Sequence, residues 1–183
     1  MKIGTPTEVE SGENRVAMTP DSALQLQKLG YECLIQSGAG ARADFSDADY
    51  EAAGVTVVPD ADALWAQADI IAKVRIPQEA ELDRLTPEKT LITFFNPGGN
   101  AEGLEKAKAK GANVIAMEMV PRISRAQKMD ALSSMANIAG YRAVIEAGNN
   151  FGRFFTGQIT AAGKVPPAKV LIVGAGVAGL AAI

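Results

Sequence analysis

A glycine-rich segment near the C-terminus has the spacing of a dinucleotide-binding turn. Gly174, Gly176 and Gly179 form a G-x-G-x-x-G pattern that opens a predicted helix. The pattern directly follows an apolar run, Lys169–Val173, which we predict to be a strand. In such turns the first glycine permits a tight bend, the second lets the backbone approach a pyrophosphate, and the third lets helix and strand pack closely. The alternative is a glycine-rich turn in some other α/β protein.

The residue that would select the nucleotide lies outside this sequence. The acidic side chain that binds the adenosine ribose is expected about 20 residues beyond the fingerprint. The sequence ends at Ile183, four residues after Gly179. It therefore does not distinguish NAD from NADP, and we expect a fragment that binds NADH weakly or not at all by itself.

A polar loop in the middle of the chain offers a second set of candidate residues. It leaves the carboxyl end of a predicted strand, Asn113–Met119, and in parallel sheets ligands bind at that end. Arg122 and Gln127 could donate hydrogen bonds to a nicotinamide carboxamide. Asp130 and Ser133 could accept hydrogen bonds from it. The alternative is that Asp130 only caps a helix and Arg122 is a solvated loop charge, and spacing alone leaves both interpretations open.

Strand-like and helix-like segments alternate through the first 120 residues. Strands that are separated by helices need crossover connections, which predicts an α/β fold with a mostly parallel sheet and flanking helices. The predicted strands are Lys2–Pro6, Glu32–Gln36, Val55–Val58, Asp69–Val74, Thr90–Phe95 and Asn113–Met119. The predicted helices are Asp21–Leu29, Asp47–Ala53, Ala61–Ala68, Glu79–Leu85 and Ala101–Lys110.

A longer helix, Asp130–Ala147, is predicted to lead into a second domain. It is expected to stop at Gly148–Asn150, and the aperiodic segment Phe151–Ala168 is expected to be a linker. We predict domains at 1–136 and 137–183, the second being this helix and the first strand, turn and helix of a Rossmann domain. Small residues recur along the helix at spacings that let another backbone approach closely. They are Ser133, Ala136, Gly140, Ala143 and Ala147.

Composition excludes several classes of protein. The 183 residues carry a net charge of −3, so a nucleic-acid partner is not expected. There is no histidine and only one cysteine, so we predict neither a metal site nor a disulfide scaffold. The longest apolar run, Val170–Ile183, has fourteen residues, short of the roughly 20 that span a bilayer. A soluble, cytoplasmic chain is expected.

Two stretches resemble the alpha subunit of proton-translocating NAD(P) transhydrogenase, namely Pro121–Tyr141 and Phe151–Ile183. The openings Lys2–Pro6 and Asn14–Pro20, with Phe45–Tyr50, resemble the N-terminal domain that this subunit shares with alanine dehydrogenase. The resemblance implies an NAD(H)-binding part that passes hydride to NADP+ on a partner domain, coupled to proton translocation. It also implies a homodimer whose partners are the NADP(H)-binding and membrane domains of the complex. Through this complex the chain would lie at the cytoplasmic face of the inner membrane.

The resemblance also assigns site residues, with Gln127 as the candidate catalytic residue because it would orient the nicotinamide. The nicotinamide-contacting loop falls on Arg122, Gln127, Asp130 and Ser133. The glycine fingerprint falls on Gly174, Gly176 and Gly179, with the backbone of Val177 and Ala178 beside the diphosphate.

The lack of histidine favours transhydrogenase over alanine dehydrogenase. Reduction of an imine or carbonyl needs a positioned acid or base, whereas hydride transfer between two nicotinamides leaves no proton over and needs only geometry. Alanine dehydrogenases use a lysine and a histidine; Lys73 and Arg15 resemble their residues, but Asn96 stands at the expected histidine position. Lys73 and Arg15 are then interpreted as structural. A fragment that only folds and dimerises is the alternative without catalysis.

Overall fold

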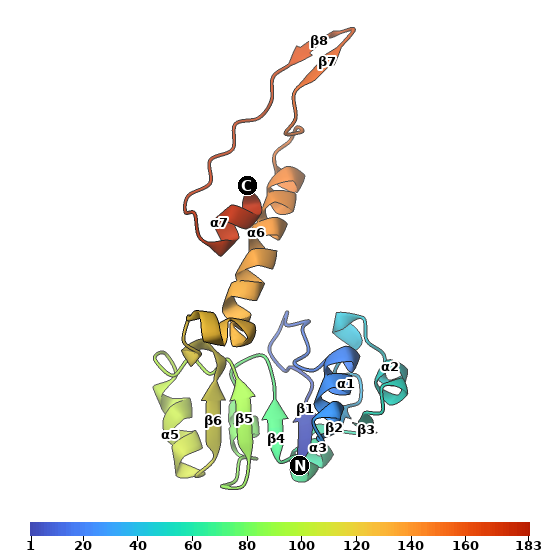
Figure 1. Cartoon of the computed structure of the whole chain (residues 1–183), viewed down its shortest axis with the longest axis vertical. Helices are drawn as coiled ribbons and strands as arrows, with labels where there is room; N and C mark the ends of the chain where they lie inside the picture. Colours follow the sequence, from blue (N-terminus) through green and yellow to red (C-terminus); the bar gives the residue numbers. More distant parts are fainter. The chain divides into compact units, whose positions relative to one another are not determined.

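A six-stranded sheet organises the first part of the chain in this computed structural model, which describes residues 1–183 (Figure 1). Every neighbouring pair is parallel, in the order β3-β2-β1-β4-β5-β6, so the winding reverses between β1 and β4. The predicted α/β fold with a mostly parallel sheet is confirmed. The strands are β1 (Lys2–Thr5), β2 (Glu32–Gln36), β3 (Thr56–Val58), β4 (Ile70–Ala72), β5 (Thr90–Thr93) and β6 (Asn113–Ala116).

The crossover helices begin where the sequence places capping residues. Thr19 and Ser46 accept hydrogen bonds from backbone N–H groups in the first turns of α1 and α2, and both form capping boxes. Several elements are one to three residues shorter than predicted, and β6 gives way to a 3₁₀ turn. The helices are α1 (Pro20–Lys28), α2 (Asp47–Ala52), α3 (Ala61–Gln67), α4 (Glu79–Leu82) and α5 (Ala101–Ala109), with 3₁₀ turns at Ala41–Ala43 and Met117–Met119.

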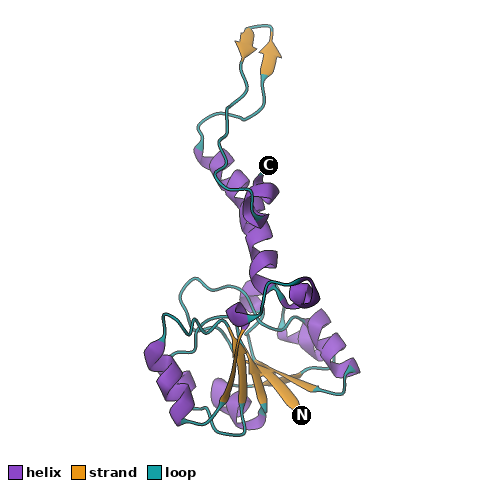
Figure 2. Ribbon diagram, turned by 60° about the vertical axis from the view of Figure 1, so that its left-hand side comes forward, coloured by secondary structure: helices purple, strands orange, loops and turns teal.

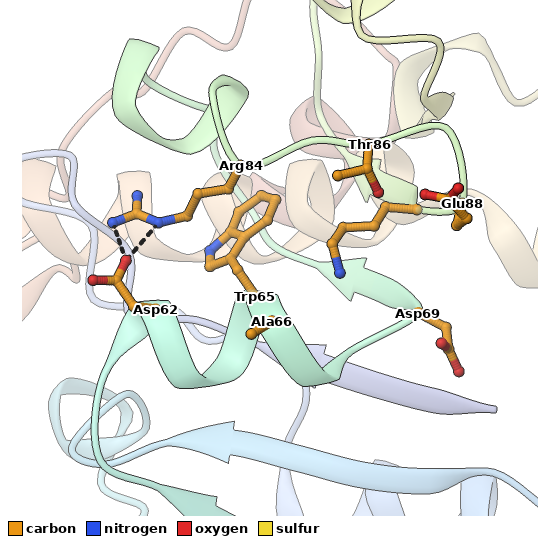
Figure 3. A pocket seen from close by; sticks show the side chains of 8 residues that line it. Asp62, Trp65, Ala66, Asp69, Arg84, Thr86 and Glu88 are labelled. Atoms are coloured by element: carbon orange, nitrogen blue, oxygen red, sulfur yellow. Dashed lines mark hydrogen bonds and ion pairs between the residues drawn. The ribbon is translucent and has the colours of Figure 1, made fainter.

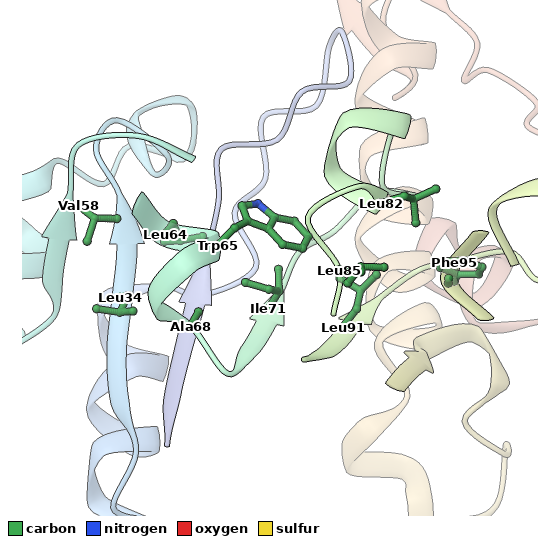
Figure 4. Packing of buried hydrophobic residues seen from close by; sticks show 11 residues of the cluster. Leu34, Val58, Leu64, Trp65, Ala68, Ile71, Leu82, Leu85, Leu91 and Phe95 are labelled. Atoms are coloured by element: carbon green, nitrogen blue, oxygen red, sulfur yellow. The ribbon is translucent and has the colours of Figure 1, made fainter. Parts of the chain in front are cut away.

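Helices cover both faces of this sheet (Figure 2). Alternate residues of β2 point to opposite faces, so Leu34 belongs to one apolar cluster while Cys33 and Ile35 belong to the other. The first cluster holds Trp65 of α3 together with residues of α4 and α5 (Figure 4). The second is closed by α1 and α2. Cys33 is 3% exposed and is therefore a core residue.

The second part of the chain, Pro121–Ile183, is a separate compact unit. It contains a 3₁₀ segment (Ser124–Met129), α6 (Ala131–Asn150), the antiparallel hairpin of β7 (Gln158–Thr160) and β8 (Gly163–Val165), and α7 (Val177–Ala182). The first unit ends at Val120, whereas the predicted domain boundary, between residues 136 and 137, falls inside α6.

Three predictions for this second unit are wrong. The helix continues through Gly148 to Asn150, whose side-chain amide donates to the Glu146 carbonyl at 2.8 Å and so supports the last turn. The predicted linker contains the β7–β8 hairpin. The predicted strand Lys169–Val173 is not a strand, because a strand is defined by a hydrogen-bonded neighbour and these residues have none in this chain. The predicted helix after the glycines is present as α7.

None of the helices in this structure is both long enough and apolar enough to cross a membrane.

Candidate functional site

A pocket of about 350 Å³ lies in the second unit, between the start of α6 and the glycine turn. Most of the predicted site residues line it, although the loop and the turn are about 40 residues apart in sequence. From the loop comes Arg122, and from the start of α6 comes Ser133. From the turn and α7 come Gly174, Gly176, Val177, Ala178 and Gly179.

The three glycines of the turn have different backbone surroundings. Gly174 has a φ of +106°, a conformation that side chains with a Cβ rarely adopt. A Cβ on Gly179 would lie 1.9 Å from the Gly174 carbonyl oxygen. A Cβ on Gly176 would meet no atom within 4 Å. The first glycine is therefore needed for the bend and the third for close packing, and the backbone at the second is open to a ligand.

A close approach of two backbones holds α7 against α6. A Cβ added to Gly140 would lie 2.0 Å from the carbonyl oxygen of Ala178. Gly140 is also the buried residue of α6. The small-residue stripe predicted for this helix therefore does admit another backbone, and that backbone is α7 of the same chain.

Asp130 and Ser133 form a fixed pair at the start of α6. One carboxylate oxygen of Asp130 accepts from the Ser133 backbone N–H at 2.9 Å, and the other accepts from its hydroxyl at 2.6 Å. The Ser133 hydroxyl, then its backbone N–H and more weakly the charge of Arg122 hold the pKa of Asp130 below its usual value. Asp130 is thus the helix cap, and as a charged cap it also orients the hydroxyl of a pocket residue.

Gln127 is not brought into the pocket. It lies in the 3₁₀ segment before α6, its side chain is exposed, and that side chain makes no hydrogen bond within the chain. Arg122 is also exposed, but it lines the pocket. The structure therefore groups Arg122, Asp130 and Ser133 near the glycine turn and leaves Gln127 outside.

Sequence reasoning missed three apolar residues that line the pocket, Leu132, Ala136 and Val173. Leu132 and Ala136 are one helical turn apart and flank Ser133, so helical spacing could have identified them. Val173 directly precedes the fingerprint and is 90% exposed. These residues give the pocket an apolar wall, as most small-molecule sites have.

A larger hollow of about 570 Å³ in the first unit is a weaker candidate. Trp65 lies at its centre, and two of its cations are already bound to neighbours (Figure 3). Arg84 contacts Asp62 at 2.6 Å, and the ammonium group of Lys89 donates to the Ala68 carbonyl at 2.8 Å. The hollow also lies where β4 and β5 begin, whereas ligands of parallel sheets bind where strands end.

The carboxyl edge of the first sheet carries the residues that resemble those of alanine dehydrogenases. Lys73 follows β4, and its fully buried ammonium group lies 2.9 Å from Glu81 and 3.5 Å from Glu8. This supports a structural role for Lys73, because both carboxylates neutralise it within the fold.

Arg15 and Asn96 are also held by neighbouring carboxylates. Arg15 binds Glu13 through two of its nitrogens, at 2.8 and 2.7 Å. Asn96 has a φ of +52°, and its backbone N–H donates to Glu118. The same carboxylate accepts from the N–H of Phe95 at 3.1 Å. Glu118 therefore fixes the loop in which Asn96 replaces the expected histidine.

Two known domain models match this chain, and both belong to one family. A model of the N-terminal domain of the alanine dehydrogenase/PNT family matches residues 4–139, and a model of the C-terminal domain of that family matches residues 143–183. The chain belongs to the alanine dehydrogenase/PNT family. The two domain models meet within α6.

Relatives within this family include transhydrogenases and alanine dehydrogenases. The whole chain is 74% identical to NAD(P) transhydrogenase subunit alpha of Cereibacter sphaeroides and covers 35% of that protein. Over 98% of its length it is 35% identical to alanine dehydrogenase of Mycolicibacterium smegmatis, covering 48% of that enzyme. The chain thus spans about a third to a half of the length of these relatives.

Solved structures of this family give the same order of similarity. A transhydrogenase from Sinorhizobium meliloti superposes with a TM-score of 0.95 at 42% identity, over all of this chain and 52% of that one. An L-alanine dehydrogenase superposes with a TM-score of 0.87 at 32% identity, over all of this chain and 50% of that one.

The glycine geometry yields a prediction about folding. Gly179→Ala places its Cβ against the Gly174 carbonyl, so α7 must shift, and we expect its amide protons to exchange at least about tenfold faster. Gly176→Ala is the matched control, because its Cβ enters open space, and exchange should stay within about twofold of the wild type. Hydrogen exchange measured by NMR tests both. Equal effects of the two substitutions would contradict the packing role of Gly179.

The Glu13 carboxylate yields a prediction about pH. Its hydrogen bonds to Arg15 lower its pKa from about 4.5 to about 2. A carboxylate whose pKa is lower in the folded state than in the unfolded state stabilises the protein at every pH above its unfolded pKa. This contribution, on the order of 3 kcal/mol, is lost as the pH falls from about 4.5 to about 2. Urea unfolding of the wild type and Glu13→Gln should differ most above about pH 5 and converge toward about pH 2.

The control for Glu13 is Glu10→Gln, because the Glu10 side chain is 47% exposed. This variant should track the wild type across the pH range. A difference between Glu13→Gln and the wild type that stays constant with pH would refute the assignment.

Proposed function

We propose that this chain supplies the NAD(H)-binding part of a proton-translocating NAD(P) transhydrogenase alpha subunit. The observation that carries the proposal is the shared pocket, in which Arg122 and Ser133 face the same space as the glycine fingerprint. The 74% identity to a transhydrogenase alpha subunit supports the transhydrogenase reaction over other dinucleotide chemistry. In this proposal hydride passes from NADH to NADP+ that is bound on a partner domain.

The residues of the pocket fit a dinucleotide. The open backbone at Gly176 leaves room for a pyrophosphate, and the N–H groups of Val177 and Ala178 are at the first turn of α7, where they lack intrahelical acceptors. Arg122 adds the only charged side chain among the residues that line the pocket. A positive charge from the loop and free N–H groups from α7 both face the pocket, and together they favour an anionic ligand.

The loop residues are proposed to hold the nicotinamide ring. When bound, the reduced nicotinamide supplies the hydride. The Ser133 hydroxyl donates a hydrogen bond to Asp130, so the lone pairs of its oxygen remain available to accept one from a carboxamide N–H group. Arg122 is placed to donate to the carboxamide oxygen. Leu132 and Ala136 provide an apolar surface that excludes water.

Gln127 is proposed to complete the site only in the assembled complex. Its exposed side chain and lack of partners leave it available to contact a bound ring or a neighbouring domain. Its task would be orientation, since hydride transfer between two nicotinamides depends on geometry. We therefore propose Gln127 as the catalytic residue, because it would orient the nicotinamide ring.

The same proposal extends to partners and location. We propose a homodimer that works with NADP(H)-binding and membrane domains at the cytoplasmic face of the inner membrane, where hydride transfer is coupled to proton translocation. Residues 1–136 would be the N-terminal domain, and residues 137–183 would begin the NAD-binding Rossmann domain. The two family models, which meet between residues 139 and 143, support this division.

The alanine dehydrogenase reaction is not favoured by the first unit. Lys73 is buried between two carboxylates, and Asn96 offers no ionisable group at the position where a histidine is expected. Imine reduction needs a proton donor that can reach its substrate. Neither residue provides one here.

Substitution of Gln127 tests its proposed role in the full-length parent protein. Gln127→Ala should slow single-turnover hydride transfer about ten- to a hundredfold, because the ring is less well oriented. The Kd for NADH should change less than about fivefold, since one exposed hydrogen bond is lost. Lys128→Ala, in the same exposed 3₁₀ segment, is the control and should leave both values unchanged. A large loss of binding with an unchanged rate would contradict the proposal.

The substrate distinguishes the two reactions of the family. In the full-length parent, turnover of pyruvate and ammonia with NADH should stay below about one-hundredth of the rate of NADH-to-NADP+ transhydrogenation, because a general acid is missing. Assays in parallel on one preparation measure both rates. Appreciable reductive amination would overturn the transhydrogenase assignment.

A further inference from the structure

The hollow where β4 and β5 begin contains a buried hydrogen-bond donor that has no acceptor. Its lining comes mainly from α3 and from the loop between α4 and β5 (Figure 3). Trp65 of α3 is 2% exposed, and its indole Nε1–H group makes no hydrogen bond. Figure 3 shows the nitrogen-bearing edge of the indole turned toward Asp62 and Arg84. A buried N–H group without an acceptor costs free energy, so an acceptor that reached it would bind favourably.

Two cations that line the hollow have N–H groups to spare. Lys89 donates to the Ala68 carbonyl at 2.8 Å and forms no ion pair with a carboxylate. Arg84 donates through Nη1 to the Ala80 carbonyl at 2.8 Å, and this bond can hold the guanidinium in place by itself. An ammonium group has three N–H donors and a guanidinium group has five, so neither side chain is saturated. The hollow therefore presents donors from both α3 and the loop.

The ion pair of Asp62 and Arg84, which lies beside the indole nitrogen, can open at little cost. Nε and Nη2 of Arg84 both donate to the same oxygen of Asp62, at 2.9 and 2.6 Å. The Asp62 side chain is 83% exposed, and exposed ion pairs contribute little to stability. An anion with several oxygens can therefore replace Asp62 beside Arg84 and also accept from the indole N–H group.

The other acidic residues of the hollow lie away from the indole nitrogen. Figure 3 shows Asp69 and Glu88 on the side of the hollow opposite to Asp62. Asp69 also accepts from the backbone N–H of Lys2 at 2.7 Å, so its carboxylate is tied to the start of β1. Once Asp62 is displaced, the part of the hollow next to Trp65 therefore carries positive charge.

We propose that this hollow binds a phosphate group, free or on a small metabolite, which displaces Asp62 from Arg84. The phosphate oxygens accept from the indole N–H of Trp65, the ammonium group of Lys89 and the guanidinium group of Arg84. A tetrahedral dianion accepts hydrogen bonds from several directions, which suits donors that come from two elements. The volume of about 570 Å³ leaves room for a small organic body. This inference goes beyond the proposed nucleotide site and does not depend on it.

The proposal is tested by NMR, because Trp65 is the only tryptophan of the chain and gives a single indole N–H signal. The full chain is titrated with sodium phosphate, and with sodium chloride at matched ionic strength. Phosphate should move the indole proton downfield as it gains an acceptor, and the shift should saturate with a Kd of roughly 1–10 mM. Chloride should leave the signal in place. A signal that phosphate does not move would overturn the proposal.

Two pairs of variants show whether the bound anion uses this hollow. Lys89→Gln should raise the Kd at least about tenfold, whereas Lys108→Gln, which removes an exposed cation of α5, should stay within about twofold. Asp62→Asn should lower the Kd about three- to tenfold, because the competing carboxylate is gone. Glu105→Gln, an exposed carboxylate of α5, is its control and should change nothing. If Lys89→Gln does not fold, Asp62→Asn and its control decide alone.

The outcome for the variants separates this site from other anion sites of the chain. Phosphate that binds only at the glycine turn would give the same Kd in Lys89→Gln and Lys108→Gln, and this result would overturn the proposal. Weaker binding in Asp62→Asn would also overturn it. A parallel titration with glycerol 3-phosphate distinguishes the two sources of the phosphate group. A lower Kd than that of inorganic phosphate supports a phosphorylated metabolite as the ligand, and an equal Kd supports phosphate itself.

Discussion

The pocket that we propose as the nucleotide site depends on two places where two backbone segments touch with no side chain between them. At Gly140 the carbonyl of Ala178 lies so near α6 that a Cβ would be 2.0 Å away, and at Gly179 the carbonyl of Gly174 is nearer still. At such distances no side chain fits between α7 and its neighbours. The glycine turn is thereby held beside Ser133 and Arg122, and the pocket exists because of this contact. Any change at these glycines moves one wall of the site relative to the other.

The chain has no histidine, and its two units differ in how their charged side chains are neutralised and exposed. In the first unit the carboxylates Glu8, Glu13 and Glu81 neutralise the buried or half-buried cations at the sheet edge, so the edge offers little reactive charge to solvent. In the second unit a single charge pair, Asp130 with Arg122 nearby, is solvent-accessible at the start of α6. Chemistry that needs orientation and no proton transfer suits the second arrangement.

Particular elements show why some sequence predictions were right and others were not. The predicted helices α1, α2 and α6 are present, and their caps Thr19, Ser46 and Asp130 each accept from a backbone N–H only three positions away, so these starts depend on local sequence. The segment Lys169–Val173 has the composition of a strand, yet it forms none, because a strand needs a neighbour that composition does not supply. The end of α6 was misplaced because the side chain of Asn150 stabilises a turn that its residue types would disfavour.

The sequence by itself determined the features that depend on short spacing. The alternation of strands and helices, the caps, the glycine turn and the small-residue stripe of α6 all depend on residues within one or two turns of each other. Only the tertiary structure decided which of these elements meet. It placed Leu132, Ala136 and Val173 in the pocket, left Gln127 outside it, and brought the Glu8 carboxylate to the backbone N–H of Val74. Such contacts join residues tens of positions apart, and they are set by how whole elements pack, which no local pattern encodes.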